Sequence, residues 1–216
     1  MTSNEIFDAP MTPGDSARPL IRSSSDGLPS AVGWAHLLIE GRLGAGDVAV
    51  DATAGNGHDT LFLARKTGPS GKVYAFDVQE AAIASTRQRL LDAGIAEESF
   101  CLPHCGHEEL EERLPAGLRG RVRVIMFNLG YLPGSDKGVI TRTASTLRAV
   151  RSSLDWLAPG GLLTVVVYPG HEGGAEEARE IAALFASLPA RSHEVQHLRP
   201  VNRSAAPPEC WVVLKR

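Results

Sequence analysis

The chain is poor in cysteine, has no long apolar run and carries no excess of positive charge. Its 216 residues include only three cysteines, Cys101, Cys105 and Cys210, which are too few for a disulfide framework. No apolar stretch approaches the roughly 20 residues that a membrane helix requires. The N-terminus lacks the basic start and hydrophobic stretch of a signal peptide. We therefore expect an enzyme-sized domain in a reducing cytoplasm, with no membrane partner.

The charge balance argues against a protein-wide surface for nucleic acid. The formal net charge is −3 and the sequence pI is about 6.2, whereas nucleic-acid-binding domains usually carry a basic face. Local patches stay open, because Arg142, Arg148 and Arg151 could share one face of a helix and Arg199 and Arg203 flank a later loop. Arginines at helical spacing are more often a solvated face. A small target such as an anticodon stem-loop nevertheless needs only a few phosphate contacts.

The pattern of apolar residues predicts alternating strands and helices. Residues 1–28 are rich in Pro, Ser, Asp and Thr and read as a flexible tail, and residues 29–216 as a single domain. Strands are expected at 48–52, 72–77, 99–102, 122–127 and 162–168, and helices at 29–42, 58–67, 80–93, 108–113, 145–157 and 175–187, with a turn at 158–161. A final strand pair, 193–200 and 209–215, has no helix between its members. This order predicts an α/β fold, a doubly wound Rossmann-like sheet that is mostly parallel and ends in an antiparallel C-terminal hairpin.

A glycine turn follows the first strand and points to a cofactor. Residues 47–60 run from an apolar strand through Asp51 to Gly55 and Gly57, and then into a helix. Strand, tight turn and helix place a ligand-binding loop at the carboxyl end of a parallel strand. Asp77 closes the second strand, 20 residues beyond Gly57, where a carboxylate can accept hydrogen bonds from ribose hydroxyls. The pairing indicates an adenosine-bearing ligand.

The form of this loop favours one cofactor over another. A dinucleotide site requires the spacing G-x-G-x-x-G, so that a pyrophosphate reaches a helix N-terminus. Here Asp51 precedes the glycines and no third glycine follows, which disfavours a nicotinamide oxidoreductase. A carboxylate would repel pyrophosphate but suits a ligand with an amino group and a sulfonium. The loop resembles motif I of the class I S-adenosylmethionine methyltransferases, with Thr53 where many members have the first glycine.

A second candidate site follows the fourth strand. The strand at 122–127 runs into Asn128-Leu-Gly-Tyr131, at the position where aminomethyltransferases carry Asn/Asp-Pro-Pro-Tyr. In that motif the Asn side chain and a backbone carbonyl accept hydrogen bonds from an amine and aim its lone pair at the methyl group. Here the Asn and the aromatic residue are kept and both prolines are replaced. On these four residues alone, a simple turn closing a strand is an equally good interpretation.

The segment His104-Cys105-Gly106-His107 holds three groups that could bind a metal. No second cluster completes a tetrahedral zinc site, so we predict no metal. Cys105 lacks the Pro-Cys or Thr-Cys setting of a pyrimidine methylase nucleophile, and we reject covalent catalysis. His107 either lies beside the cofactor or is an ordinary loop histidine.

Several motifs together resemble one family. They are Asp51-Ala-Thr-Ala-Gly-Asn-Gly-His-Asp-Thr60, Phe76-Asp-Val-Gln79, Phe127-Asn-Leu-Gly-Tyr-Leu-Pro133, Asp136-Lys137 and Tyr168-Pro-Gly-His-Glu-Gly-Gly174. They are similar to those of the MnmM (YtqB-type rRNA methylase) family, over about residues 30–216. The resemblance implies N-methylation of the 5-aminomethyl group on a 2-thiouridine at the tRNA wobble position, with S-adenosyl-L-methionine as cofactor and the anticodon stem-loop as partner. Analogy with the family also suggests a homodimer.

The expected site residues follow from these motifs. The predicted cofactor-binding residues are Asp51, Thr53, Gly55, Asn56, Gly57, Asp59, Thr60, Asp77, Gln79, His107, Asn128 and Leu129. The predicted substrate-binding residues are Leu129, Gly130, Tyr131, Tyr168, His171 and Asn202. We expect Asn128 and Leu129 to orient the amine, Tyr131 to pack on the base, and His171 or water to accept the proton, which makes Asn128, Tyr131 and His171 the catalytic candidates. The alternative, non-functional interpretations are that His171 is simply exposed in a glycine turn and that Pro207-Pro208, after Asn202, is a rigid connector.

Two other functions stay open at this level. The enzyme could methylate another amine, such as an rRNA base or a small metabolite. It could also bind S-adenosylmethionine or RNA without catalysis, although the presence of Asn128, Tyr131 and His171 argues against that. Activity on tRNA against a metabolite panel separates the first of these from the wobble-base function.

Overall fold

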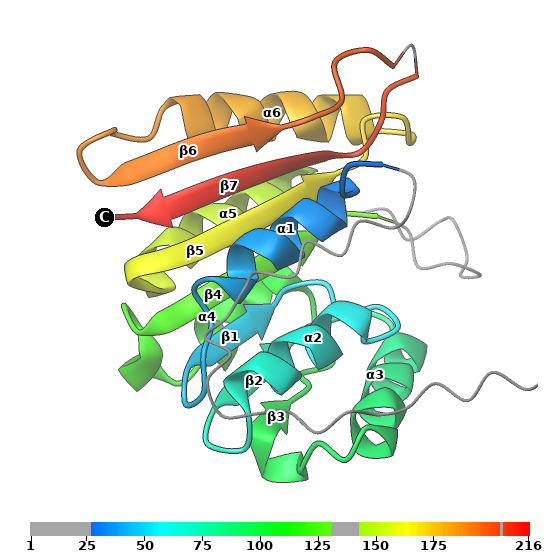
Figure 1. The fold of residues 1–216 in the computed structure, drawn as a ribbon, viewed down its shortest axis with the longest axis vertical. Helices are drawn as coiled ribbons and strands as arrows, with labels where there is room; N and C mark the ends of the chain where they lie inside the picture. The colour runs from blue at the N-terminus through cyan, green and yellow to red at the C-terminus, as the bar shows by residue number, and fades with distance from the viewer. Residues whose placement is uncertain (1–26, 131–142, 204) are drawn as a thin grey trace, which may run out of the picture.

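The computed structural model describes residues 27–130, 143–203 and 205–216, and a seven-stranded sheet forms its centre (Figure 1). The strand order is β3-β2-β1-β4-β5-β7-β6. β1, β2, β3, β4 and β5 run parallel, and β7 pairs antiparallel with both β5 and β6. The predicted fold class, with its antiparallel C-terminal hairpin, is confirmed.

The bounds of most elements lie within two residues of the predicted ones. The strands are β1 (Val48–Asp51), β2 (Lys72–Ala75), β3 (Phe100–Cys101), β4 (Val122–Asn128), β5 (Leu157–Val167), β6 (His193–Leu198) and β7 (Glu209–Lys215). The α-helices are α1 (Ala31–Glu40), α2 (His58–Thr67), α3 (Glu80–Asp92), α4 (Leu110–Arg113), α5 (Thr143–Trp156) and α6 (Gly174–Ala186). Short 3-10 turns at Glu97–Ser99, His107–Glu109 and Ala116–Leu118 complete the described elements.

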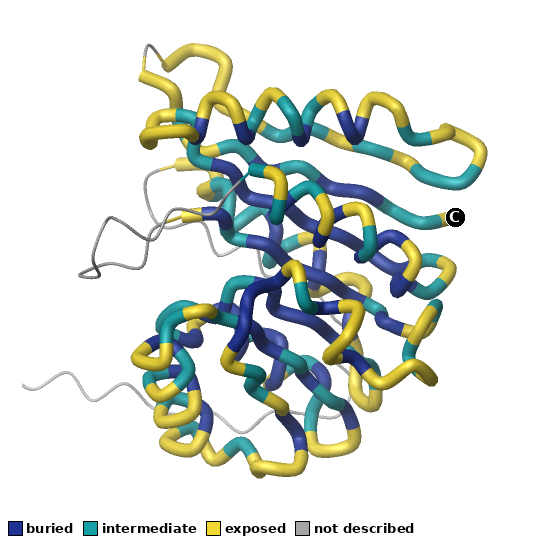
Figure 2. Tube along the Cα trace, turned by 180° about the vertical axis from the view of Figure 1, so that it is seen from behind, coloured by how far each residue is buried: buried dark blue, intermediate teal, exposed yellow. Residues whose placement is uncertain are grey.

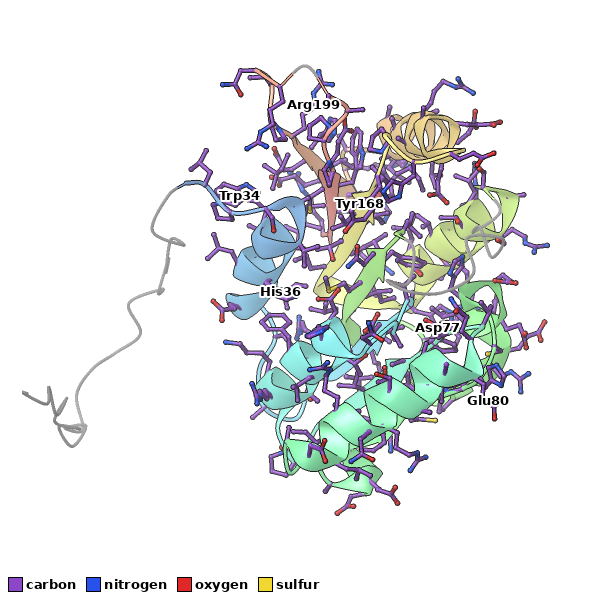
Figure 3. All side chains as sticks on the ribbon, turned by 90° about the vertical axis from the view of Figure 1, so that its right-hand side faces the viewer. Trp34, His36, Asp77, Glu80, Tyr168 and Arg199 are labelled. Atoms are coloured by element: carbon purple, nitrogen blue, oxygen red, sulfur yellow. The ribbon has the colours of Figure 1, made fainter. Side chains whose placement is uncertain are left out.

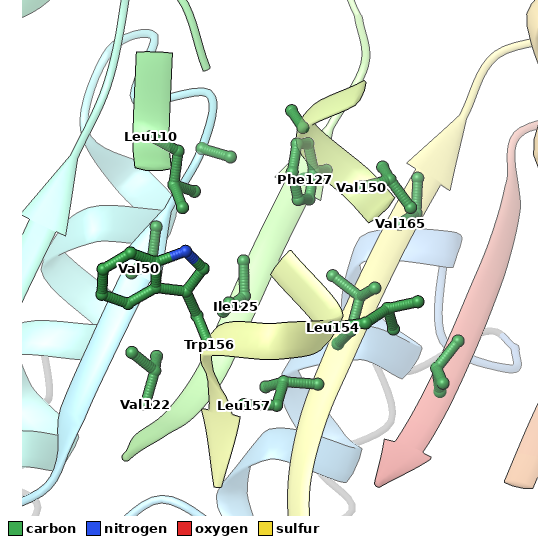
Figure 4. Packing of buried hydrophobic residues seen from close by; sticks show 14 of the residues in the cluster. Val50, Leu110, Val122, Ile125, Phe127, Val150, Leu154, Trp156, Leu157 and Val165 are labelled. Atoms are coloured by element: carbon green, nitrogen blue, oxygen red, sulfur yellow. The ribbon is translucent and has the colours of Figure 1, made fainter. Parts of the chain in front are cut away.

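Helices cover both faces of the sheet. On one face α1, α2 and α3 bury residues such as Ile39, Leu63 and Leu90 against the strands. On the other face α4, α5 and α6 pack on a second cluster, and Figure 4 shows Trp156, from the end of α5, near Val50 and Ile125. The central strands are buried and the outer faces of the helices are exposed (Figure 2). Burial on both faces explains why these strands are near-continuous apolar runs.

One local prediction is wrong, and the cause is a bulge. The sequence predicts a turn at 158–161 before a strand that begins at Leu162, but β5 already begins at Leu157. Leu157 pairs with Val122 and Leu162 pairs with Val124, so the residues between them bulge out of the ladder. Gly160 has φ +74°, a left-handed conformation that glycine adopts without strain. The Pro-Gly-Gly signal therefore marks an interruption within a strand.

The parallel strands bring their carboxyl ends to one edge of the sheet. β1 lies between β2 and β4, so Asp51, at the end of β1, lies between the residues that follow β2 and those that end β4. This edge is where open α/β sheets bind ligands. The predicted tail at 1–28 lies outside the described residues except for Gly27 and Leu28. Over the described part of the chain, no helix is long and apolar enough to cross a membrane.

Candidate active site

The loop after β1 is built around the buried carboxyl group of Asp51. The hydroxyl of Thr60, in the first turn of α2, donates to Asp51 Oδ2 at 2.6 Å. The backbone N–H of Thr53 donates to Asp51 Oδ1 at 3.1 Å. Asp51 and Thr60 are fully buried. In this structure both therefore support the loop from its inner side.

Three carboxylates share this corner of the sheet edge. Burial, and then the negative charge of Asp59 and of Asp77, raise the pKa of Asp51 from 3.8 to about 7. The hydrogen bonds from Thr60 and Thr53 act in the opposite direction but do not prevail. A buried group with raised pKa beside two further acids favours a cationic ligand, because a positive charge would stabilise the ionised form of Asp51.

The glycine turn is anchored to α3 and to the residue that follows β2. The N–H of Gly55 donates to Asp77 Oδ2 at 2.9 Å, and the hydroxyl of Thr86 donates to the Gly55 carbonyl at 3.1 Å. Gly57 has φ +78°, and a Cβ there would lie 2.8 Å from the Cα of Thr86. Only glycine therefore permits this close approach of the loop to α3.

Asn56, Asp77 and Gln79 lie together around the same turn. Arg89 Nε donates to the carbonyl of Asn56 at 2.6 Å. The N–H of Gln79 donates to Asp77 Oδ1 at 2.9 Å, so both carboxylate oxygens of Asp77 already hold backbone N–H groups. A carboxylate oxygen has a second lone pair, which leaves Asp77 able to accept from ribose hydroxyls as well.

Asn128 ends β4 next to Asp51 and is held by three groups. Its N–H donates to the Thr53 hydroxyl at 2.8 Å, which ties β4 to the loop after β1. Its side-chain Nδ2 donates to Asp59 Oδ2 at 3.1 Å, and its Oδ1 accepts from the Tyr168 hydroxyl at 2.8 Å. Burial, and then the charge of Asp59, raise the pKa of Tyr168, so its hydroxyl keeps the proton that it donates. The structure thus gives the predicted amine acceptor a fixed orientation.

The loop after β5 lies beside Asn128. The rings of Tyr168 and His171 stack with centroids 5.1 Å apart. Gly130 packs against Tyr168, where an added Cβ would lie 3.2 Å from the ring, and a Cβ at Gly174 would overlap the Tyr168 carbonyl oxygen. Leu129 is buried, with its N–H bonded to the Val166 carbonyl at 2.9 Å. These contacts bring four predicted substrate residues, Leu129, Gly130, Tyr168 and His171, to one place.

Asn202 and Tyr131 are placed less fully. Asn202 is exposed in the loop between β6 and β7, and that loop approaches the loop after β5 at Gly170, where a Cβ would lie 3.1 Å from the Ala206 carbonyl oxygen. Tyr131, together with Asp136 and Lys137 of the family motif, lies outside the described residues. The roles given to Asn202 and Tyr131 stay predictions.

His107 is buried against β4. It is buried at the start of a 3-10 turn and meets Phe127 edge to face, with centroids 5.7 Å apart. Burial lowers its pKa, which keeps the ring neutral, and its Nε2 has no hydrogen-bond partner among the described residues. Within that same part of the chain, no three His, Cys, Asp or Glu side chains gather as a metal site would require.

One residue of this site was missed by sequence reasoning. His36, on α1, hydrogen-bonds through Nε2 to Asp59 Oδ1 at 2.8 Å and stacks on Phe62 at 3.9 Å. Figure 3 shows it where α1 meets α2. The predicted cofactor residue Asp59 is thereby engaged on both oxygens, by His36 and Asn128. No motif marks His36 in the sequence, since a lone histidine on an amphipathic helix carries no pattern.

Comparison with known proteins agrees with this geometry. The family model described as "Putative rRNA methylase" matches residues 73–214. A chloroplastic tRNA (mnm(5)s(2)U34)-methyltransferase of Arabidopsis thaliana is 38% identical over 188 residues, which are 84% of this chain and 68% of that protein.

Two solved structures share the fold and about a third of the sequence. A protein described as a "putative rRNA-methylase" from Clostridium thermocellum superposes with a TM-score of 0.83 at 33% identity, over 88% of this chain and all of that one. A Streptococcus mutans protein described as a "putative methyltransferase", in complex with SAH, gives 0.78 at 32% identity, over 88% of this chain and 100% of its own. The chain therefore belongs to the rRNA methylase family, which has the class I methyltransferase fold.

Proposed function

We propose that this chain transfers a methyl group from S-adenosylmethionine to the 5-aminomethyl group of 5-aminomethyl-2-thiouridine, at the wobble position of a tRNA. The observation that carries the proposal is the side chain of Asn128, which ends β4 with its Oδ1 directed toward Tyr168 and its Nδ2 bonded to Asp59. Because Asp59 engages Nδ2, the Oδ1 is the end of the carboxamide that can also accept from an amine, which supports the proposal. The name of the 38% identical Arabidopsis relative supports the choice of amine.

The residues at the sheet edge fit S-adenosylmethionine. When bound, this cofactor supplies a methyl group on a positively charged sulfur. The acidic corner formed by Asp51, Asp59 and Asp77 suits that charge, and the carboxylate of Asp77 suits ribose hydroxyls. Glycine at position 57 lets this loop pack closely against α3, because an added Cβ would lie 2.8 Å from the Cα of Thr86. The SAH bound to the Streptococcus mutans relative supports the same choice.

The chain's own residues then align the amine. Displacement at a methyl group requires a neutral nitrogen lone pair in line with the leaving sulfur, and an N–C bond forms as the C–S bond breaks. Asn128 Oδ1 and the carbonyl of Leu129 accept N–H bonds from the amine and leave its lone pair directed at the methyl group. Tyr131 packs on the base, and His171 or water takes the proton. Alignment of this kind lowers barriers by roughly 7–11 kcal/mol in well-oriented cases.

The net charge of −3 does not favour a tRNA partner, but several exposed arginines could bind its phosphates. Arg148 and Arg151 are exposed on α5, Arg199 and Arg203 are exposed after β6, and Arg142 lies outside the described residues. A few phosphate contacts suffice for a stem-loop, although each one makes binding dependent on salt. The cytoplasmic location and the homodimer expected from the sequence belong to this proposal and rest on the sequence and the family resemblance.

Nucleoside mass spectrometry tests the function directly. Purified protein and S-adenosylmethionine are incubated with tRNA that lacks the wobble methyl group, and the digested nucleosides are compared with a reaction without protein. A new methylaminomethyl-thiouridine peak is the expected result. Calorimetric binding of S-adenosylmethionine without that peak would refute the proposed substrate and direct the search to rRNA bases and small amines. Binding without turnover on any of these would favour a non-catalytic module.

A further inference from the structure

A chain of side-chain hydrogen bonds crosses the candidate active site from α1 to the residue that follows β5. His36 bonds to Asp59 Oδ1 at 2.8 Å, and Asp59 Oδ2 accepts from Asn128 Nδ2 at 3.1 Å. Asn128 Oδ1 then accepts from the Tyr168 hydroxyl at 2.8 Å. The four residues come from α1, α2, β4 and the loop after β5, and 132 positions separate the first from the last. The carboxylate of Asp59 can only accept, so its two partners must donate to it, and this fixes which end of the Asn128 carboxamide is turned toward Asp59.

The direction of these hydrogen bonds decides which end of the Asn128 carboxamide faces the substrate. A carboxamide has a donor end and an acceptor end of nearly the same shape, so it can turn over unless its partners distinguish them. Asp59 as a carboxylate only accepts, which draws Nδ2 toward it and leaves Oδ1 for Tyr168 and the amine. With the ends exchanged, the NH₂ group of Asn128 would face the N–H groups of the amine, and two donors repel each other.

Asp59 can perform this task only if it is itself held. Its side chain is 10% exposed, and its second oxygen is bonded by His36, whose Nε2 must carry the shared proton. The ring of His36 is fixed in turn by stacking on Phe62, with an interplanar angle of 11°. The His36 side chain is 29% exposed, so a substitution there disturbs little of the core.

We propose that His36 is a positioning residue for methyl transfer, which acts through Asp59 to keep the Oδ1 of Asn128 presented to the substrate amine. This inference rests on the proposed function for its kinetic consequence. Its structural part, the fixed orientation of the Asn128 carboxamide, does not depend on the identity of the substrate. His36 touches neither the amine nor the methyl group in this scheme.

A matched pair of variants separates the hydrogen bond from the ring. His36→Phe keeps an aromatic ring against Phe62 but removes the donor to Asp59. His36→Gln removes the ring but places an N–H at about the same distance along the side chain. Loss of a hydrogen bond to a charged group corresponds to about a tenfold change or more. We expect kcat on tRNA to fall about tenfold in His36→Phe, with the Kd for S-adenosylmethionine unchanged, and to recover largely in His36→Gln.

A double-mutant comparison tests the route through Asp59. Residues that act through one another give non-additive effects. If His36 acts through Asp59, the variant with both His36→Phe and Asp59→Asn will be no slower than Asp59→Asn alone. Multiplication of the two losses would overturn the proposal, as would a wild-type kcat in His36→Phe.

A spectroscopic readout keeps the test independent of turnover. The side-chain NH₂ resonances of Asn128 are assigned in ¹⁵N-labelled protein by their loss in Asn128→Ala. We expect them to shift and to exchange faster with solvent in His36→Phe, and to return toward wild type in His36→Gln. Unchanged resonances in His36→Phe would refute the positioning role. An inactive wild-type enzyme with shifted resonances would instead refute only the proposed substrate.

Discussion

Replacing Asp51 with asparagine should remove a strong pH dependence from the stability of this fold. The pKa of Asp51 is raised from 3.8 to about 7 by burial and by the nearby charges of Asp59 and Asp77. A difference of about three between the unfolded and folded pKa corresponds to roughly 4 kcal/mol, since each pKa unit is worth 1.36 kcal/mol. Ionised Asp51 therefore destabilises the native state by an amount comparable to much of a domain's total stability.

The sign of the effect follows from which state holds the proton. Because the folded pKa lies above the unfolded one, the native state binds the proton more tightly between pH 4 and pH 7. The contribution of Asp51 to stability is full below its unfolded pKa and is lost as the pH rises through about 7. Asparagine has no proton to lose. Its Oδ1 can still accept from the Thr53 N–H, and the Thr60 hydroxyl can rotate to accept from its amide.

Urea unfolding at a series of pH values from 4.5 to 8 measures this difference. We expect the free energy of unfolding of Asp51→Asn, relative to wild type, to rise with pH and to level off above about pH 7. Asp92→Asn, at an exposed position in the last turn of α3, serves as the control for loss of a surface carboxylate. A relative stability of Asp51→Asn that stays constant over this range would show that Asp51 is ionised in the folded protein throughout, and would refute the reasoning.

Three further results are expected. Affinity for S-adenosylmethionine should rise by up to about tenfold from pH 6 to pH 8, because its positive charge favours ionised Asp51; SAH, which lacks the sulfonium, and Asp51→Asn should show a smaller slope by calorimetry. Asn128→Ala should keep the wild-type Kd for S-adenosylmethionine and lose most turnover in a methyl-transfer assay, and normal turnover would contradict the role of its carboxamide. Gly57→Ala should lower the free energy of unfolding by about 1–3 kcal/mol in urea titrations, since its φ is +78° and the new Cβ would meet Thr86; a neutral effect would mean that the loop relaxes freely.

The local part of this architecture could be predicted from the sequence. Strand, glycine turn and helix around Asp51 depend on neighbouring residues, on apolar periodicity and on the backbone freedom of Gly57, so their positions were found to within two residues. The placement of Asp51, Asp77 and Asn128 after consecutive strands follows the same logic, because parallel strands end at one edge of a sheet. The Pro-Gly-Gly at 158–161 shows the limit, since a bulge and a turn use the same residues.

The contacts between distant residues were decided only by the tertiary structure. The order of the strands places β1 beside β4, so the Thr53 hydroxyl can accept a hydrogen bond from the N–H of Asn128, 75 positions away. The packing of α1 against α2 brings His36 to Asp59, and no sequence motif predicts this contact. The raised pKa of Asp51 depends on burial and on two other carboxylates, which no spacing specifies. Sequence periodicity determines which residues reach the sheet edge, whereas the packing of whole elements determines which of them touch, because hydrogen bonds and electric fields depend on distance in space.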